Sequence, residues 1–342
     1  MKIAAGLVLL AVTAALIPLS PPLVEGWYST GLYPEIQSAL TPASNLVPIA
    51  LLDVAAVALI VTAMLAFVRR ARALGANGAI RRTAATGAGW AGVIYLLFLA
   101  CWGLNYRRVP LEQKLDYERS RVTRDAAILL ANTAARAMNG GFDAAHARQW
   151  DMRTLERPFA GAQLALGSHR VAATGRPKRS LLSLYFRWAA IDGMTDPFFL
   201  EVILNPDVLD VERPFVLSHE WAHLAGYADE SEANYVAWLT CLRGDALAQY
   251  SGWIAAYGHA AGALDHDSRA RLTPLDPGPA SDLRAIAARD ATASPAVRRA
   301  AEGVYDGYLR ANRVAEGIAS YDAVLRLMLG TRMDPGWRPR PR

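Results

Sequence analysis

Two histidines and a glutamate in the run His219-Glu220-Trp221-Ala222-His223 are the residues of this chain best suited to chemistry. On a helix, side chains four residues apart lie on one face, so both imidazoles can bind the same metal ion. Glu220 can then deprotonate a water molecule on the open side of that ion. This HExxH pattern is typical of zinc hydrolases and predicts a catalytic site for one Zn²⁺ ion.

The alternative is a buried helix whose histidines only make hydrogen bonds. The flanking residues favour the metal site. Pro214 and Ser218 precede a run that can begin a helix, and Gly226 stands where that helix would end. A second, acidic helix follows at once, and it can supply the third protein ligand that a catalytic zinc ion needs.

Glu230 and Glu232 both qualify as the third ligand. The run from Asp229 to Glu232 has the pattern of a capping box, in which Asp229 caps the helix and Glu232 reaches back to it. This leaves Glu230 free to bind the metal. Asn234 lies one turn further along the same face, where it can orient a ligating histidine.

Two further sets of residues are candidates for roles around the metal. His259, Tyr250 and Tyr257 follow the metal helices and could stabilise the oxyanion of a tetrahedral intermediate. Residues 196–204, beginning Asp196-Pro197-Phe198-Phe199, could form an edge strand beside the active-site helix and hold an extended peptide. A core strand without a substrate role is the alternative for this segment.

The first hundred residues are strongly apolar. The whole chain has 342 residues, of which 53% are hydrophobic and only 20% charged. Apolar runs at about residues 3–19, 47–68 and 87–104 are each about long enough to cross a hydrocarbon core. We therefore expect three transmembrane helices, with the first an uncleaved anchor rather than a signal peptide.

The distribution of arginine predicts how the chain lies in the membrane. The loop between the second and third spans carries five arginines, Arg69, Arg70, Arg72, Arg81 and Arg82, whereas the loop before it carries Glu25 and Glu35 and no basic residue. The positive-inside rule places the arginine loop in the cytoplasm, although Arg107 and Arg108 oppose this mildly. The catalytic domain is then extracytoplasmic, on a multi-pass protein of the bacterial inner membrane.

The basic character of the chain, with a pI near 9.3, does not indicate nucleic acid as a partner. Its basic residues are scattered or lie beside the apolar runs, so the lipid bilayer is the simpler partner. Residues 1–105 are expected to form the membrane anchor and residues 106–335 the metallopeptidase domain. Residues 336–342 are expected to be a disordered basic tail. The expected fold class is mainly α, with an α-rich, zincin-like (α+β) domain after the three spans.

These residues also resemble a known family, the bacterial membrane proteins called domain of unknown function 3810. The resemblance includes Trp102 to Arg108, the segment from Gly193 to Glu201, the HExxH run with Glu230 to Asn234, and Tyr305 to Leu309. Trp221 departs from the family, where a smaller aliphatic residue is usual; this position faces away from the metal and affects packing. The resemblance implies a gluzincin-like zinc metallopeptidase.

The expected function is therefore hydrolysis of peptide bonds in envelope proteins or peptides. His219, His223 and Glu230 would hold zinc, and Glu220 would be the general base. The alternative is a non-catalytic membrane scaffold in which the same residues bind a structural zinc ion. Such sites are closed by four protein ligands, often including cysteine, and no cysteine lies near this motif in the sequence.

Overall fold

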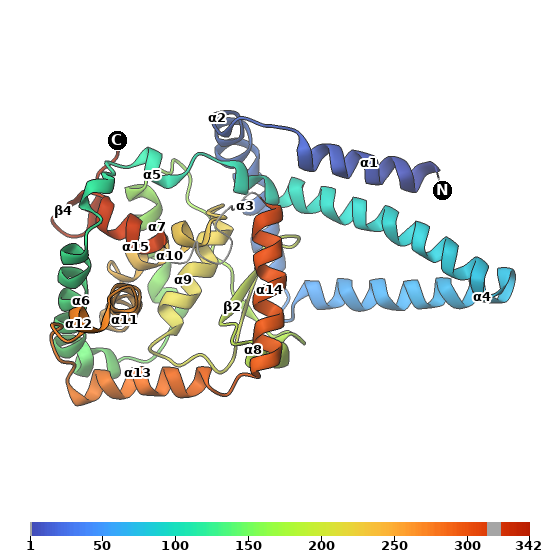
Figure 1. The fold of residues 1–342 in the computed structure, drawn as a ribbon. Coiled ribbons are helices and arrows are strands. Elements are labelled where there is room, and N and C mark those ends of the chain that lie inside the picture. The colour runs from blue at the N-terminus through green and yellow to red at the C-terminus, as the bar shows by residue number, and fades with distance from the viewer. Residues whose placement is uncertain (1, 313–322) are drawn as a thin grey trace.

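The computed structural model describes residues 2–312 and 323–342. The chain is mainly helical, as expected, with short strands near the middle and at the C-terminus. Figure 1 shows a body of packed helices from which a bundle of long helices projects to one side. The HExxH run lies in the body, on a helix that faces a small sheet.

The projecting part consists of α1 (Lys2–Leu16) and α4 (Leu51–Cys101). α4 reverses direction at Gly75, which has a φ of 71° that only glycine adopts readily, so it forms a helical hairpin (Figure 1). α1 packs on its second half. A Cβ atom added at Gly92 would lie 3.0 Å from the Leu7 carbonyl oxygen, so glycine permits this close approach.

The three separate spans expected from the sequence are not found. Among the described residues, one helix, α4, is by itself long and apolar enough to cross a membrane, and none of its most apolar window is buried. The expected second and third spans, 47–68 and 87–104, lie within it except for residues 47–50 and 102–104. The expected first span is helical only to Leu16, and it passes the same test only together with residues 21–44, from which it is bent by 112°.

Residues 25–44, expected to be a loop of the anchor, are helical together with residues 21–24 and belong to the body. They form α2 (Pro21–Val24), the π-helix η1 (Glu25–Leu32) and α3 (Tyr33–Ser44). The Tyr33 hydroxyl donates to the carbonyl oxygen of Leu224, at the end of the HExxH helix, at 2.8 Å. The boundary expected at residue 105 therefore does not separate the anchor from the body.

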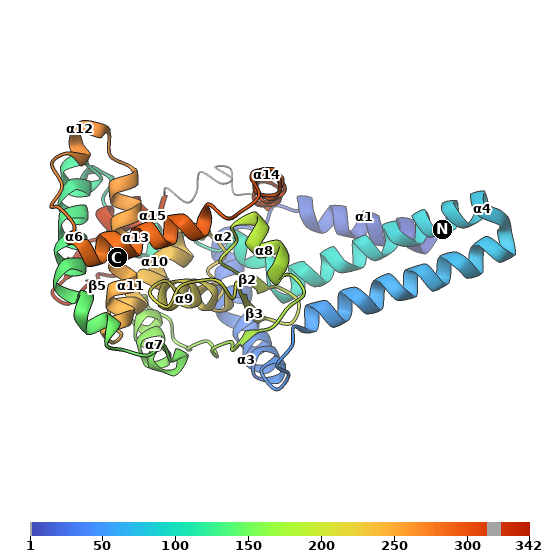
Figure 2. The ribbon, with the colours of Figure 1, turned by 90° about the horizontal axis from the view of Figure 1, so that it is seen from below.

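A three-stranded sheet joins the hairpin to the site. Its order is β1 (Pro177–Lys178), β3 (Glu201–Leu204), β2 (Gly193–Asp196), with β1 parallel and β2 antiparallel to β3. β1 and β2 are the edge strands, and β2 is the one that lies against α9. Figure 2 shows β2 and β3 between α9 and the base of the hairpin.

The edge strand expected at residues 196–204 is wrong, whereas the alternative of a core strand is found for residues 201–204, which form β3. Pro197, Phe198 and Phe199 form the turn between β2 and β3, and β3 is the central strand. The Asp196 carboxylate accepts hydrogen bonds from the backbone N–H groups of Phe198 and Phe199, at 3.3 and 2.7 Å. This local bonding by Asp favours a turn over a continuous strand.

The other helices of the body enclose one apolar core. The pair that carries the expected site is α9 (Arg213–Leu224) and α10 (Glu230–Cys241), and all twelve residues of α10 are buried. Around them lie η2 (Gly103–Arg107), α5 (Leu111–Lys114), η3 (Arg119–Arg121), α6 (Arg124–His146), η4 (Met152–Leu155), α7 (Glu156–Ala165), α8 (Ser183–Ala189), α11 (Ala246–Gly262), α12 (His266–Arg269), α13 (Pro277–Asp290), α14 (Pro295–Ala311) and α15 (Ala323–Gly330).

The C-terminal residues, expected to be a disordered tail, are folded against the body. β4 (Met333–Asp334) pairs with β5 (Arg338–Pro339) in an antiparallel hairpin. Between them, the Trp337 ring packs edge-on against Trp238 and Trp253, with ring centres 5.4 and 5.3 Å apart. The burial of this aromatic surface outweighs the ordering cost that the basic, proline-rich composition suggested.

Candidate metal centre

α9 and α10 bring the predicted ligands together. Gly226, just beyond α9, has a φ of 83°, and a Cβ atom there would lie 3.1 Å from Asn105 Oδ1, so the tight turn requires glycine. Asp229 then caps α10 by accepting hydrogen bonds from the backbone of Ser231 and Glu232. The short connection turns the first residue of α10, Glu230, toward the histidines of α9.

Three side chains converge on one point. His219 Nε2 lies 3.1 Å from His223 Nε2 and 3.2 Å from Glu230 Oε2, and His223 Nε2 lies 3.6 Å from Glu230 Oε1. The ligands of a tetrahedral zinc ion with bonds of about 2.1 Å lie roughly 3.4 Å apart. In the described part of the chain, these three side chains are the only group of such residues close enough to hold a metal ion.

The other ring nitrogens of both histidines have hydrogen-bond acceptors. Asn234 Oδ1 lies 2.9 Å from His219 Nδ1, and the Tyr227 carbonyl oxygen lies 2.8 Å from His223 Nδ1. Each acceptor requires the proton on Nδ1 and leaves the Nε2 lone pair directed at the common point, as in histidines that bind metals. The predicted role of Asn234 agrees with this contact.

The electrostatics of the group favour a positive charge at that point. Burial opposes protonation of His223, yet the carboxylates of Glu230 and Glu220 raise its pKa to about 9. Burial likewise opposes ionisation of Glu230, but the two histidines hold its pKa well below the usual range. Glu230 Oε2 is buried and lies 3.2 Å from His219 Nε2 without a hydrogen bond of regular geometry. The donor set therefore fits a divalent cation such as Zn²⁺.

Glu220 lies under the edge strand. Its Oε2 is 2.8 Å from the Thr195 hydroxyl, which is also 2.9 Å from the Glu220 carbonyl oxygen. The strand backbone passes so close that a Cβ atom at Gly193 would lie 2.7 Å from Glu220 Oε1, so glycine is needed there. Burial raises the pKa of Glu220. A raised pKa suits a carboxylate that must accept and then return a proton.

Tyr305 was not predicted as a site residue, but its hydroxyl donates to Glu230 Oε1. It comes from α14, which Figure 1 shows between the body and the hairpin. The Tyr305 ring stacks on Tyr308, and Tyr308 in turn meets the edge of Tyr106, each pair with ring centres 6.0 Å apart. An aromatic wall thus borders the metal ligands on the side of α14.

The other predicted stabilisers lie elsewhere. The Tyr250 hydroxyl donates to Asp282 at 2.6 Å, and its ring packs on Phe142. Tyr257 packs against the apolar core, and His259 is outside the metal-binding group formed by the described residues. These contacts of Tyr250 and Tyr257 are not with the three candidate ligands, whereas the Tyr305 hydroxyl donates to one of them, Glu230.

Glu232 is not one of the three side chains that could hold the metal ion, and only half of the expected capping box is found. Asp229 is the cap, as predicted, whereas the Glu232 carboxylate accepts from the backbone N–H of Leu111 at 2.5 Å instead of reaching back to Asp229. Trp221 is fully buried; its indole N–H donates to the Gly175 carbonyl oxygen at 2.7 Å, so this residue affects packing, as expected.

Comparison with known proteins places the chain in a family. A family model described as a protein of unknown function, DUF3810, matches residues 28–329. The chain belongs to this family, and the match includes the hairpin, the sheet, both metal-ligand helices and α14. No curated protein and no solved structure matches the chain.

Proposed function

We propose that this protein is a membrane-anchored zinc metallopeptidase with a zincin-like catalytic domain. The observation that carries the proposal is the arrangement of His219, His223 and Glu230 around one point, with both Nδ1 atoms engaged behind them. A general base, Glu220, lies on the same helix beneath the edge strand. Three ligands and one open position are what a catalytic zinc ion needs.

The residues of the chain divide the work of hydrolysis. His219, His223 and Glu230 hold the zinc ion, which when bound supplies Lewis acidity and makes water more acidic. Glu220 accepts a proton from the attacking water and returns it to the leaving amine as the peptide C–N bond breaks. The Thr195 hydroxyl orients the Glu220 carboxylate. The Tyr305 hydroxyl is the proposed hydrogen-bond donor to the developing oxyanion.

The edge strand β2 is the proposed binding site for the peptide. Asp192, just before β2, accepts a hydrogen bond through its carbonyl from the backbone of Asn205. Along an antiparallel pair, every second residue points its backbone N–H and C=O groups toward the partner strand. Because Asp192 points its groups toward β3, Gly193 and Thr195 point theirs toward the open edge. An extended peptide can add to that edge directly above Glu220. This arrangement needs little sequence specificity, because main-chain bonds carry the binding.

The proposed location is the bacterial inner membrane, crossed more than once, with the body outside the cytoplasm. Each half of α4 has about 25 residues, roughly 37 Å of helix, enough to cross the hydrocarbon core. The five arginines of residues 69–82 lie near the turn of the hairpin, at the end far from the body (Figure 1). The positive-inside rule supports a cytoplasmic turn and hence envelope proteins or peptides as substrates.

The competing proposal is a scaffold that binds zinc only for structure. Metal analysis and hydrolysis of envelope peptides by the purified full-length protein separate the two. We expect one zinc ion per chain in the wild type, loss of zinc in His223→Ala, and zinc without hydrolysis in Glu220→Gln.

Two matched variants control these measurements. His169→Ala removes an exposed histidine and Glu112→Gln an exposed glutamate, and both should behave like the wild type. In cells, envelope peptides sharing an apolar residue beside the cut should accumulate only with Glu220→Gln. A wild type without stoichiometric zinc would contradict the metal site. Zinc retained with identical peptide profiles in wild type and Glu220→Gln would leave the scaffold.

A further inference from the structure

Large apolar side chains are uncovered where the hairpin leaves the body. Trp188 and Leu184 of α8 are 49% and 51% exposed, and Leu181 just before it is 74% exposed. The chain that leads into α4 adds Leu46 and Ile49, at 85% and 48%. A soluble surface rarely gathers so many large apolar residues in one place, so this patch indicates a contact with an apolar phase.

The backbone beside this patch is fixed to the first turn of the hairpin. The Asp53 carboxylate, in that turn, accepts from the Ser180 hydroxyl at 3.0 Å and from the Leu181 N–H at 2.7 Å. Ile49 and Arg179 form a parallel bridge just before it. The patch therefore lies at the level where α4 begins, which is where a spanning hairpin enters the bilayer.

The buried face of α8 packs against the sheet whose edge strand, β2, is the proposed peptide-binding site. Phe186 is buried against Ala50 and Ile203, and Met194 of β2 packs on the same cluster. Side chains alternate along a strand, so Met194 faces α8 while Thr195, next to it, faces Glu220. A single layer of sheet therefore separates α9, the helix of the two histidines, from the base of the hairpin. Packed layers lie roughly 10 Å apart, so Glu220 is about one layer above the membrane level.

The composition of the patch matches a lipid headgroup region. Trp188 and Tyr185 combine an apolar ring with a polar atom, as do aromatic residues at membrane interfaces. Arg176 and Arg179 are exposed beside them and can meet anionic phosphates. A protein partner would be expected to cover the apolar residues without needing this basic rim.

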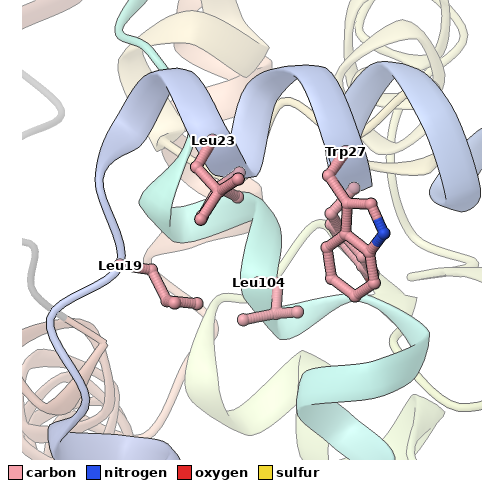
Figure 3. Close-up of a pocket in the computed structure, with 6 residues that line it drawn as sticks. Leu19, Leu23, Trp27 and Leu104 are labelled. Carbon is pink, nitrogen blue, oxygen red and sulfur yellow. The ribbon is translucent and has the colours of Figure 1, made fainter.

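A second apolar feature lies at the same level on the other side of the hairpin base. Leu104, three residues beyond α4, and Leu19, three beyond α1, line a pocket of about 290 Å³ with Leu23 and Trp27 (Figure 3). Trp27 is 62% exposed. Figure 1 shows α2 and α8 on opposite sides of the hairpin base. Trp27 belongs to η1, which continues directly from α2, and Trp188 belongs to α8.

We propose that the α8 patch, defined as Leu46, Ile49, Leu181, Leu184, Tyr185 and Trp188, rests in the lipid interface and holds β2 at the bilayer surface. This inference rests on the peptidase proposal and adds the substrate class to it. The substrates are extended segments of membrane-anchored proteins just outside the bilayer. A peptide tethered to the membrane reaches β2 at a high effective concentration, whereas a free peptide must be captured from solution.

Spin labels in the full-length protein test the membrane contact without reference to catalysis. A labelled cysteine at Leu184 or Trp188 is compared with one at Leu129, a leucine on α6 that is also largely exposed and lies far from the hairpin, all in a Cys101→Ala background that keeps only the buried Cys241. The protein is held in bilayer discs of phosphatidylethanolamine and phosphatidylglycerol. Labels at 184 and 188 should collide preferentially with dissolved oxygen, and the label at 129 with a water-soluble nickel chelate.

Labels at 184 and 188 that behave like the one at 129 would overturn the proposal. So would labels shielded from both reagents, because that result means a protein partner covers the patch. In a second arm, Leu184→Glu with Trp188→Glu should slow cleavage of a lipid-tethered peptide roughly tenfold or more and leave the free peptide unchanged. Equal loss on both peptides would contradict the substrate class. If neither peptide is cleaved by the wild type, the peptidase proposal fails while the label result stands.

Discussion

The metal-ligand helix α10 and the hairpin helix α4 are both rich in apolar residues, but they face different surroundings. Every one of the twelve residues of α10 is buried by protein, whereas only five of the fifty-one residues of α4 are. Apolar surface is stable only when it is removed from water. The body does this for α10, whereas protein leaves most of the surface of α4 uncovered, as is expected of a helix that can cross a membrane.

The two regions also tolerate polar groups differently. The body buries charges beside α10 because each has partners, such as Glu230 with its two histidines. The most apolar part of α4 avoids charge, and its acid, Asp53, lies in the first turn, bonded to residues of the body. The small sheet is the border between these two environments. The candidate metal centre lies on the protein side of the sheet, one layer away from it.

The largest expected effect distinguishes the two kinds of burial. Trp221→Ala should destabilise the protein by about 3–5 kcal/mol, because it leaves a cavity beside Phe159 and an unpaired carbonyl at Gly175. Ile60→Ala on α4, where the side chain is 58% exposed, should cost less than about 0.5 kcal/mol. Thermal unfolding in detergent measures both. An equal loss for Ile60→Ala would mean that protein, rather than lipid, covers α4.

The small sheet at this border should make the free energy of unfolding of the protein depend on pH. Burial raises the pKa of Asp196 on β2 to about 7, and Glu201 adds to the shift, while Lys178 and the N–H groups of Phe198 and Phe199 oppose it. In the unfolded chain this carboxyl ionises near pH 4. Between those values the folded state holds the extra proton, so the free energy of unfolding should fall as pH rises, by roughly 2–4 kcal/mol by about pH 8.

Asp196→Asn should make this slope shallower, because the amide stays neutral and can still accept a hydrogen bond from Phe199; the raised pKa values of Glu232 and His223 keep the rest of the slope. Unfolding temperatures of both proteins at about pH 5 and about pH 8 measure it. Asp207→Asn, at an exposed acid paired with Arg187, is the matched control and should keep the wild-type slope. A wild type whose stability does not fall with pH would show that the Asp196 carboxyl ionises normally at this border.

Local sequence was enough to predict the parts of the site that lie within one or two helical turns. The spacing of His219 and His223, the cap at Asp229, and Asn234 behind His219 all follow from helix geometry and are found together. The buried position of Trp221 follows in the same way. These contacts depend on neighbours in the sequence, and helical periodicity describes such neighbours well.

Contacts between distant segments could not be read in this way. Thr195 and Tyr305 reach the site from 25 residues before Glu220 and 75 residues beyond Glu230. Both lie in segments that the family resemblance included, but nothing local assigns them a role. The strand was misplaced because the aromatic pair Phe198-Phe199 favours strand, while Asp196-Pro197 before it directs a turn. The apolar runs predicted helices but not the bend at Gly75, which makes one hairpin of two expected spans.

The smallest expected effect concerns α14, the element that covers the site most thinly. Among residues 295–310 of this helix, only Leu309 is fully buried, yet Tyr305 touches Glu230, a candidate metal ligand. Tyr305→Phe should lower kcat about a hundredfold, or about 2.7 kcal/mol, with little change in KM or zinc content, because the lost hydroxyl acts on the transition state. Tyr308→Phe is the control, since that ring stacks on Tyr305 but its hydroxyl bonds to Tyr106.

Steady-state kinetics on an envelope peptide, with metal analysis of each variant, separates an effect on kcat from an effect on KM or on zinc content. If Tyr305→Phe instead loses zinc and keeps the kcat of the zinc-loaded fraction, the phenol serves to hold Glu230 in place, and α14 belongs to the buried metal centre rather than to a thin cover above it.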